Sequence, residues 1–293
     1  MDFLILFSFL CLPSIAFAEF RDADLTESAG GGPGSIYSFG SGGDVNFDTG
    51  ALHFTYLKQF APVDPTDPDV HLKGTDNWTA GVDHQLSDLW VGSLEYDQLR
   101  DTSENLSTDG IKVGASYDKY HLSYRFARSS IDETVLFSSA SQKKTVPLYG
   151  AFIYQSTVEG SVDFELTKHD TLIPDFSYSF FSPDVQAFSQ ILGNTFAGKF
   201  TNFTDTLQSI EDWALTLSYN HEMNEKWSYN VKSGVAHLIT GSNLSLELNP
   251  GVTLKYSQLL ATTLSADYVY IPGSPALTFE LEFKFHLQKD EKE

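Results

Sequence analysis

The stretch Leu277-Thr278-Phe279-Glu280-Leu281-Glu282-Phe283-Lys284-Phe285-His286-Leu287 is the most regular part of the chain. Large apolar side chains occupy every odd position, and polar or charged side chains occupy every even one. Successive side chains of a β-strand point to opposite faces, so this period of two predicts a strand with one apolar and one polar face. Its length, about ten residues, is what a tilted strand needs to cross a bilayer.

The same alternation recurs along most of the chain. Tyr120, Leu122 and Tyr124 oppose His121, Ser123 and Arg125, and Trp213, Leu215 and Leu217 oppose Asp212, Thr216 and Ser218. We predict strands over 51–60, 76–86, 89–98, 110–117, 120–128, 145–155, 159–168, 172–181, 212–221, 226–237, 246–256, 261–271 and 276–287. A soluble antiparallel barrel or sandwich would alternate in the same way, so single strands do not decide between a soluble and a membrane fold.

The N-terminus and the connections favour the membrane alternative. Residues 3–17 are almost wholly apolar and lead to Ala16-Phe17-Ala18, which predicts a signal peptide, residues 1–18. Connections alternate between short ones, such as Asp118-Lys119, and long ones, such as 61–75, 129–144 and 182–211. Short turns at one end and long loops at the other are typical of outer-membrane barrels. We predict an interfacial aromatic girdle from Trp78, Trp90, Trp213, Trp227, Tyr268 and Tyr270.

The pattern over residues 51–287 resembles that of bacterial outer-membrane β-barrels of the porin and transporter type. Glu225-Lys226-Trp227-Ser228 looks like a periplasmic turn, and the final strand looks like the terminal signal read by the barrel-assembly machinery. The resemblance implies an all-β fold: a single antiparallel up-and-down transmembrane β-barrel in the bacterial outer membrane. Single-chain bacterial barrels have even strand numbers, so the thirteen segments predict 12 strands, with 14 as the alternative if another strand lies near 192–203.

Two segments are predicted to lie outside the barrel. Residues 19–50 are rich in Gly, Ser and Asp and include Gly30-Gly31-Gly32, which predicts a flexible N-terminal segment. Residues 288–293 form a charged C-terminal tail, which departs from the terminal aromatic residue that such barrels often have. In loop 61–75, Asp64, Asp67 and Asp69 lack the spacing of a calcium loop and predict a solvated acidic loop.

The polar faces of the predicted strands would line the lumen and supply the candidate functional site. Acids outnumber bases in this set, which would favour cations or polar solutes if the lumen is open. The predicted lumen-lining residues are Asp83, Glu95, Asp97, Lys112, Arg125, Asp163, Glu165, Asp212, Lys232, Glu247, Lys255, Asp267, Glu280, Glu282 and Lys284.

Composition excludes several kinds of function. The formal net charge is −21, with 18 Lys and Arg against 39 Asp and Glu, so nucleic acid is not an expected partner. The single cysteine, Cys11, lies in the predicted signal peptide, which leaves no disulfide, thiolate metal site or cysteine nucleophile. No metal or cofactor is expected. The expected partners are outer-membrane lipid and lipopolysaccharide, the barrel-assembly machinery, and an undefined protein partner.

Three functions remain open. The first is a passive channel or transporter for small polar or cationic solutes. The second is a non-conducting barrel that anchors or docks another protein. The third is a barrel hydrolase, for which Ser123 and His121 on one predicted face are candidates. The expected class is not an enzyme.

Overall fold

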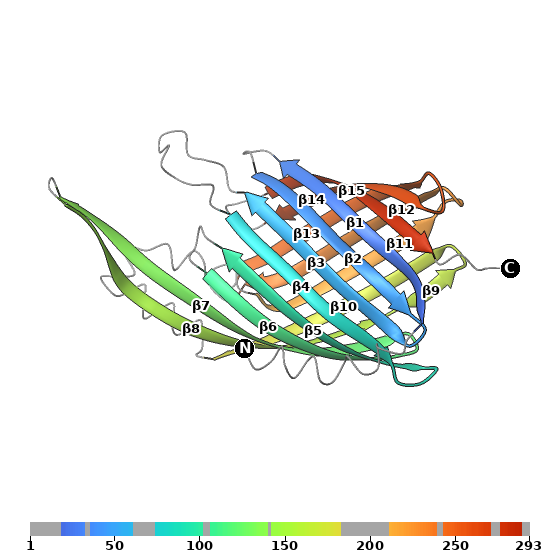
Figure 1. The fold of residues 1–293 in the computed structure, drawn as a ribbon, viewed down its shortest axis with the longest axis horizontal. Helices are drawn as coiled ribbons and strands as arrows, with labels where there is room; N and C mark the ends of the chain where they lie inside the picture. The colour runs from blue at the N-terminus through green and yellow to red at the C-terminus, as the bar shows by residue number, and fades with distance from the viewer. Residues whose placement is uncertain are drawn as a thin grey trace.

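The computed structural model describes residues 19–32, 36–60, 74–101, 106–139, 142–182, 211–238, 243–270 and 276–288. They form one antiparallel sheet that closes on itself as a barrel of tilted strands (Figure 1). Its strands are β1 (Phe20–Gly32), β2 (Ile36–Phe47), β3 (Gly50–Phe60), β4 (Gly74–Gln85), β5 (Trp90–Asp101), β6 (Leu106–Tyr117), β7 (Tyr120–Ser139), β8 (Gln142–Val162), β9 (Phe164–Thr167), β10 (Asp170–Ser182), β11 (Glu211–Glu222), β12 (Trp227–Leu238), β13 (Asn243–Lys255), β14 (Leu260–Tyr270) and β15 (Ala276–Gln288).

The fifteen labelled strands correspond to fourteen positions around the barrel. Only Asp163 separates β8 from β9, and β10 pairs with both of them. Each strand pairs with its neighbours in sequence, and β15 pairs with β1 to close the ring, for example through Asp24 opposite His286. A closed sheet leaves no strand edge without a hydrogen-bonding partner, which is the condition for crossing a lipid bilayer with strands.

The strand number corrects the main prediction: 12 was wrong, and the alternative of 14 is confirmed. Residues 19–50, predicted to be flexible, instead supply β1 and β2, so the barrel begins at Phe20 rather than at residue 51. The segments 145–155 and 159–168, predicted as two strands, are one strand with a single interruption. Merging these two segments reduces the thirteen predicted strands to twelve, and adding β1 and β2 gives the fourteen that the structure has. The suggested strand near 192–203 lies outside the described residues.

The two ends of the barrel differ. At one end the strands are joined by short turns, which are Asp48-Thr49, Leu86–Leu89, Asp118-Lys119, Lys168-His169, Met223–Lys226 and Tyr256–Leu259. Glu19 lies at this end, because its carbonyl accepts a hydrogen bond from the Asp48 amide (3.0 Å), and β15 also finishes here. At the other end β7 and β8 extend beyond their neighbours as a long hairpin (Figure 1).

Several predicted segments lie outside the described residues. These are the signal peptide 1–18, most of the loop that contains Asp64, Asp67 and Asp69, and the charged tail after Gln288, which itself belongs to β15. Within the described residues no helix has the length and apolar character needed to cross a membrane.

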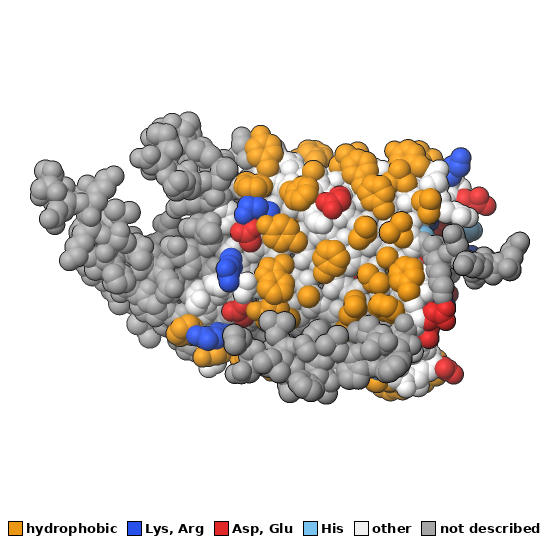
Figure 2. All heavy atoms as spheres, viewed as in Figure 1, with side chains coloured by type: hydrophobic (Ala, Val, Ile, Leu, Met, Phe, Trp, Pro, Cys, Tyr) orange, Lys and Arg blue, Asp and Glu red, His pale blue; other side chains and the backbone are white. Residues whose placement is uncertain are grey.

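The apolar side chains face outward. On β15 the odd-numbered residues from Leu277 to Leu287 are 36% to 51% exposed, and hydrophobic side chains spread over the face of the barrel that Figure 2 shows. In contrast, the buried apolar residues of the described chain are only Ala23, Val82, Ala127, Ile153, Ala236 and Leu238. A soluble barrel buries its apolar face, so this inverted arrangement requires an apolar solvent around the barrel.

Candidate functional site: the lumen wall

The polar faces of the strands line the inside of the barrel and leave two neighbouring cavities, of about 610 and 570 Å³. The larger lies against β4–β8, β10 and β11, and the smaller lies against β8 and β10–β14. Glu159, Ser177 and Glu211 belong to the walls of both, so the two cavities adjoin along β8, β10 and β11. Of the predicted lumen residues, six line these cavities: Glu95, Asp97, Lys112, Arg125, Lys232 and Glu247.

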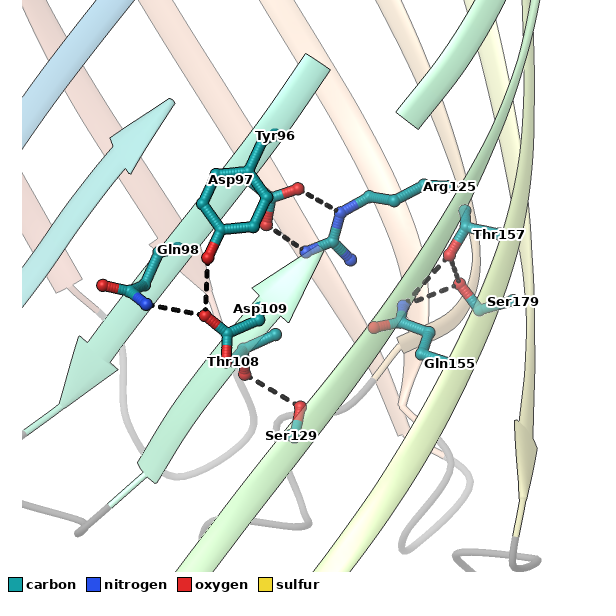
Figure 3. A network of polar contacts seen from close by, with 10 residues as sticks. All are labelled: Tyr96, Asp97, Gln98, Thr108, Asp109, Arg125, Ser129, Gln155, Thr157 and Ser179. Carbon is teal, nitrogen blue, oxygen red and sulfur yellow. Dashed lines mark hydrogen bonds and ion pairs between the residues drawn. The ribbon is translucent and has the colours of Figure 1, made fainter. Parts of the chain in front are cut away.

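The strongest ion pair of the wall joins β5 to β7. Arg125 binds Asp97 through two parallel hydrogen bonds, with Nε 2.8 Å from Oδ1 and Nη2 2.5 Å from Oδ2 (Figure 3). This pair passes over β6 at Gly110: a Cβ there would lie 2.7 Å from Arg125 Nη2 and closer still to Asp97 Oδ1. The two-point geometry fixes the guanidinium on the wall, and the glycine makes the bridge sterically possible.

Further ion pairs follow the same inner face. Lys112 contacts Glu159, which also accepts a hydrogen bond from the Ser123 hydroxyl (3.0 Å). On β12, Lys232 Nζ lies 3.0 Å from Glu247 Oε1 of β13. The three cationic groups that line the cavities are therefore each paired with a carboxylate.

Several acids of the wall have no such cation. Asp175 and Glu211 line the smaller cavity, and neither forms a salt bridge among the described residues. From the described residues, Glu211 accepts only a long hydrogen bond from the Ser245 hydroxyl (3.4 Å). Because the bases are neutralised by partners and these acids are not, the described residues that line the cavities carry a net negative formal charge.

The other predicted lumen residues lie away from the two large cavities. Asp163 contacts His121, Asp212 contacts His237, Lys255 lies 3.9 Å from Glu222, and Lys284 lies 2.9 Å from Asp24. Asp267 has one buried carboxylate oxygen with no hydrogen-bond partner among the described atoms. Glu280 lines a smaller pocket of about 260 Å³, and Glu282 lies between Ser28 and Thr263 on the neighbouring strands. Asp83 lies across from Ser93, and Glu165 is exposed in β9.

Sequence reasoning missed five residues of this wall: Asp24, His53, Glu159, Asp175 and Glu211. Asp175 stands between Pro174 and Phe176 on a strand that was predicted, so the alternation alone could have placed it on the inner face. Asp24 and Glu211 lay in segments predicted as flexible or as loop. Glu159 was placed at a strand end, whereas it belongs to the middle of a long strand.

The Ser123 and His121 pair suggested for a hydrolase does not assemble. Ser123 donates its hydrogen bond to Glu159, whereas His121 bonds Ser116 (2.8 Å) and Asp163 (3.1 Å). A nucleophilic serine needs a base within hydrogen-bond reach, and Ser123 does not have His121 in that position.

The chain is similar to solved structures of a channel and of an outer-membrane protein. CymD, a monoaromatic hydrocarbon channel, matches with a TM-score of 0.54 over 96% of this chain and 92% of its own, at 8% sequence identity. The outer membrane protein Omp33 of Acinetobacter baumannii matches with a TM-score of 0.49 over 91% of this chain and 98% of its own, also at 8% identity. No protein-family model and no curated protein matches the chain.

The chain has the fold of the bacterial outer-membrane β-barrels. Together with its apolar exterior, this fold places the protein in a bacterial outer membrane. In outer-membrane barrels the short turns face the periplasm, so here the turn end is periplasmic and the opposite end faces outward.

The predicted girdle residues of this outer-membrane barrel lie near both rims. Trp90 and Trp227 begin their strands at the periplasmic rim and are 46% and 42% exposed, and Tyr268 and Tyr270 end β14 at the outer rim. Trp78 packs against Tyr96 with ring centroids 5.1 Å apart. Trp213 differs from the others, because it contributes to the larger lumen cavity and stacks on His237.

Proposed function

We propose that this outer-membrane barrel is a passive channel for small polar or cationic solutes. The observation that carries the proposal is the pair of adjoining cavities inside the barrel, together about 1,180 Å³, lined by charged and hydroxyl side chains. Fourteen strands enclose more space than eight-stranded barrels, whose interiors are filled by side chains. The cavities are large enough for small hydrated solutes.

The charge balance of the wall supports the preference for cations. Lys112, Arg125 and Lys232 are each held by a carboxylate, so their fields are largely cancelled. The carboxylates of Asp175 and Glu211 have no salt-bridge partner within the described residues and act on the solution inside the cavities. Rings or clusters of acids in a pore raise the local concentration of cations and lower that of anions.

Conductance of the refolded chain from Glu19 onward, in a planar bilayer with a potassium chloride gradient, tests this proposal. We expect discrete current steps and a reversal potential of the sign that potassium selectivity gives. Glu211→Gln removes one charge from the shared wall of the two cavities and should lower the potassium-to-chloride permeability ratio by roughly half.

Glu27→Gln is the matched control, because Glu27 is an exposed glutamate on the outer face of β1. It should leave the permeability ratio unchanged. A folded barrel without current steps would contradict the channel and leave the anchoring or docking function as the better account. Equal effects of the two variants would show that the lumen acids do not set selectivity.

A further inference from the structure

The exterior of the barrel carries a charged ribbon across β3–β7, near the outward-facing end. In register, Lys58 of β3 lies opposite Asp76 of β4, and Asp76 lies opposite Arg100 of β5. Asp109 of β6 lies opposite Arg128 of β7. In Figure 2, basic and acidic side chains gather at one end of the hydrophobic field on this face.

The two acids of the ribbon are already occupied by donors of the protein. Asp76 accepts hydrogen bonds from Tyr56 (2.8 Å) and Lys58 (2.7 Å). Asp109 accepts hydrogen bonds from Tyr96 (2.8 Å) and Gln98 (2.6 Å), as Figure 3 shows. Both carboxylates are therefore held in place by neutral or cationic partners.

Within the part of the chain that the structure describes, the two arginines have no acceptor for their side-chain donors. Neither Arg100 nor Arg128 forms a hydrogen bond or salt bridge with a described residue, and both side chains are exposed. The Arg128 guanidinium lies 4.1 Å from the centre of the Phe152 ring, which orients its plane. A guanidinium with a fixed plane and free donors is well suited to bind a phosphate through two hydrogen bonds.

The cations of this face are also localised. Among the outward-facing residues described near the outer rim, the bases are Lys58, Arg100 and Arg128, whereas β10–β15 present Tyr178, Phe180, Leu246, Tyr268, Tyr270 and Leu277 there. Below the ribbon, towards the middle of the bilayer, lie Tyr56, Trp78 and Tyr96, aromatic side chains of the kind found at the headgroup boundary.

We propose that the exterior of β3–β7 binds the phosphate groups of outer-leaflet lipid, which is lipopolysaccharide in a bacterial outer membrane. Arg100 and Arg128 supply the donors, and Lys58 contributes positive charge beside them. Cations that stand just above the apolar band and its aromatic boundary meet lipid phosphates at the depth where those phosphates lie. This site is on the outside of the barrel and does not depend on conduction through the lumen.

Native mass spectrometry of the refolded chain from Glu19 onward, with lipid A that carries both phosphates, tests the site directly. We expect the double variant Arg100→Gln and Arg128→Gln to bind lipid A about thirtyfold more weakly than the wild type, since each cation near a charged lipid surface contributes about 1 kcal/mol. Lipid A stripped of its phosphates should bind the wild type as weakly as intact lipid A binds the double variant.

The control variant is Lys119→Gln with Lys226→Gln, which removes two cations from the periplasmic turns. It should bind lipid A like the wild type. Heat-modifiable migration in gels identifies folded protein. If the double variant does not fold, the two single variants serve, each expected to bind about fivefold more weakly. Equal binding of lipid A with and without phosphates, or equal loss in the control, would overturn the proposal.

Discussion

At the scale of single residues, Glu27 shows what a charged side chain costs on the lipid-facing surface of the barrel. It stands near the middle of β1, on the outer face, between Phe283 of β15 and Ser41 of β2, whose hydroxyl donates a hydrogen bond to it (3.0 Å). A carboxylate at this depth loses most of its hydration, and one hydroxyl donor replaces only part of it. Glu27 therefore lowers the stability of the barrel in lipid.

We predict that Glu27→Gln raises the free energy of unfolding by about 1–2 kcal/mol, because the amide removes a charge from the lipid-facing band. Denaturant unfolding in lipid vesicles, followed by tryptophan fluorescence, measures the difference. Glu282→Gln, on the inner face next to Thr263, should change stability by less than about 0.5 kcal/mol. A destabilised Glu27→Gln would mean that the carboxylate has a favourable partner of its own.

At the scale of strands, the inner face uses bridges that pass over an intervening strand. Asp97 of β5 reaches Arg125 of β7 across Gly110, and His53 of β3 reaches Glu95 of β5 (3.4 Å) across Gly81. Both bridges need a residue without a side chain at the crossing. Each one ties three strands together, whereas an ordinary cross-strand pair joins two.

Gly110→Ala should therefore separate Arg125 from Asp97 and lower the free energy of unfolding by about 1–3 kcal/mol, the usual cost of disrupting a part-buried charged hydrogen bond. Gly160→Ala is the control, because a Cβ there would meet its nearest atom at 3.7 Å, an ordinary contact. Denaturant unfolding of the two variants in vesicles separates the outcomes. If both variants were equally stable, the crossing glycine would not matter.

Strands could be predicted from the sequence where the side chains on their outer face are large and apolar. β15, with its six large apolar residues, was found almost to the residue. β1 and β2 were missed because their outer positions include Glu27, Ala29, Ser41 and Gly43, which remove the contrast between the two faces. β8 was divided in two because its outer positions include Ser156 and Gly160, small residues that resemble a turn.

The lumen wall was less predictable than the strands. Alternation places a residue on the inner or outer face, and so it could indicate Asp97, Lys112 and Arg125. It does not give the register between strands. The register decides that Arg125 meets Asp97 over Gly110, and that the Ser123 hydroxyl donates its hydrogen bond to Glu159 rather than to His121. Register depends on pairing between distant segments, and the period of one strand carries no information about it.

At the scale of the whole molecule, the closing contact joins β1 and β15. Asp24 accepts a hydrogen bond from His286 (2.8 Å) and forms an ion pair with Lys284 (2.9 Å). The junction of β1 and β15 therefore has side-chain contacts in addition to the backbone hydrogen bonds. Removal of β15 would leave β1 and β14 as two unpaired edges. In lipid each unpaired backbone group costs several kcal/mol, so we predict that a chain ending at Tyr270 does not form a heat-modifiable barrel.

A matched deletion elsewhere should be tolerated. Among the described strands, residues 132–139 of β7 and 142–150 of β8 pair only with each other, beyond the last pairs with β6 and β10. Replacing residues 134–148 with an Asn-Gly turn shortens this hairpin without opening the ring. Gel migration before and after heating compares the two deletions, and a folded chain without β15 would show that closure is not required.

The ring also sets an order in time. The segment that contains Asp24 is made near the beginning of synthesis, and its partner His286 is made 262 residues later. Until β15 has been synthesised, β1 can pair only with β2. The pairing of β1 with β15 therefore forms only after the whole chain has been made. Contacts between such distant segments form slowly because a long loop has to be closed first. The earliest strands are therefore those that carrier proteins in the periplasm would have to protect longest.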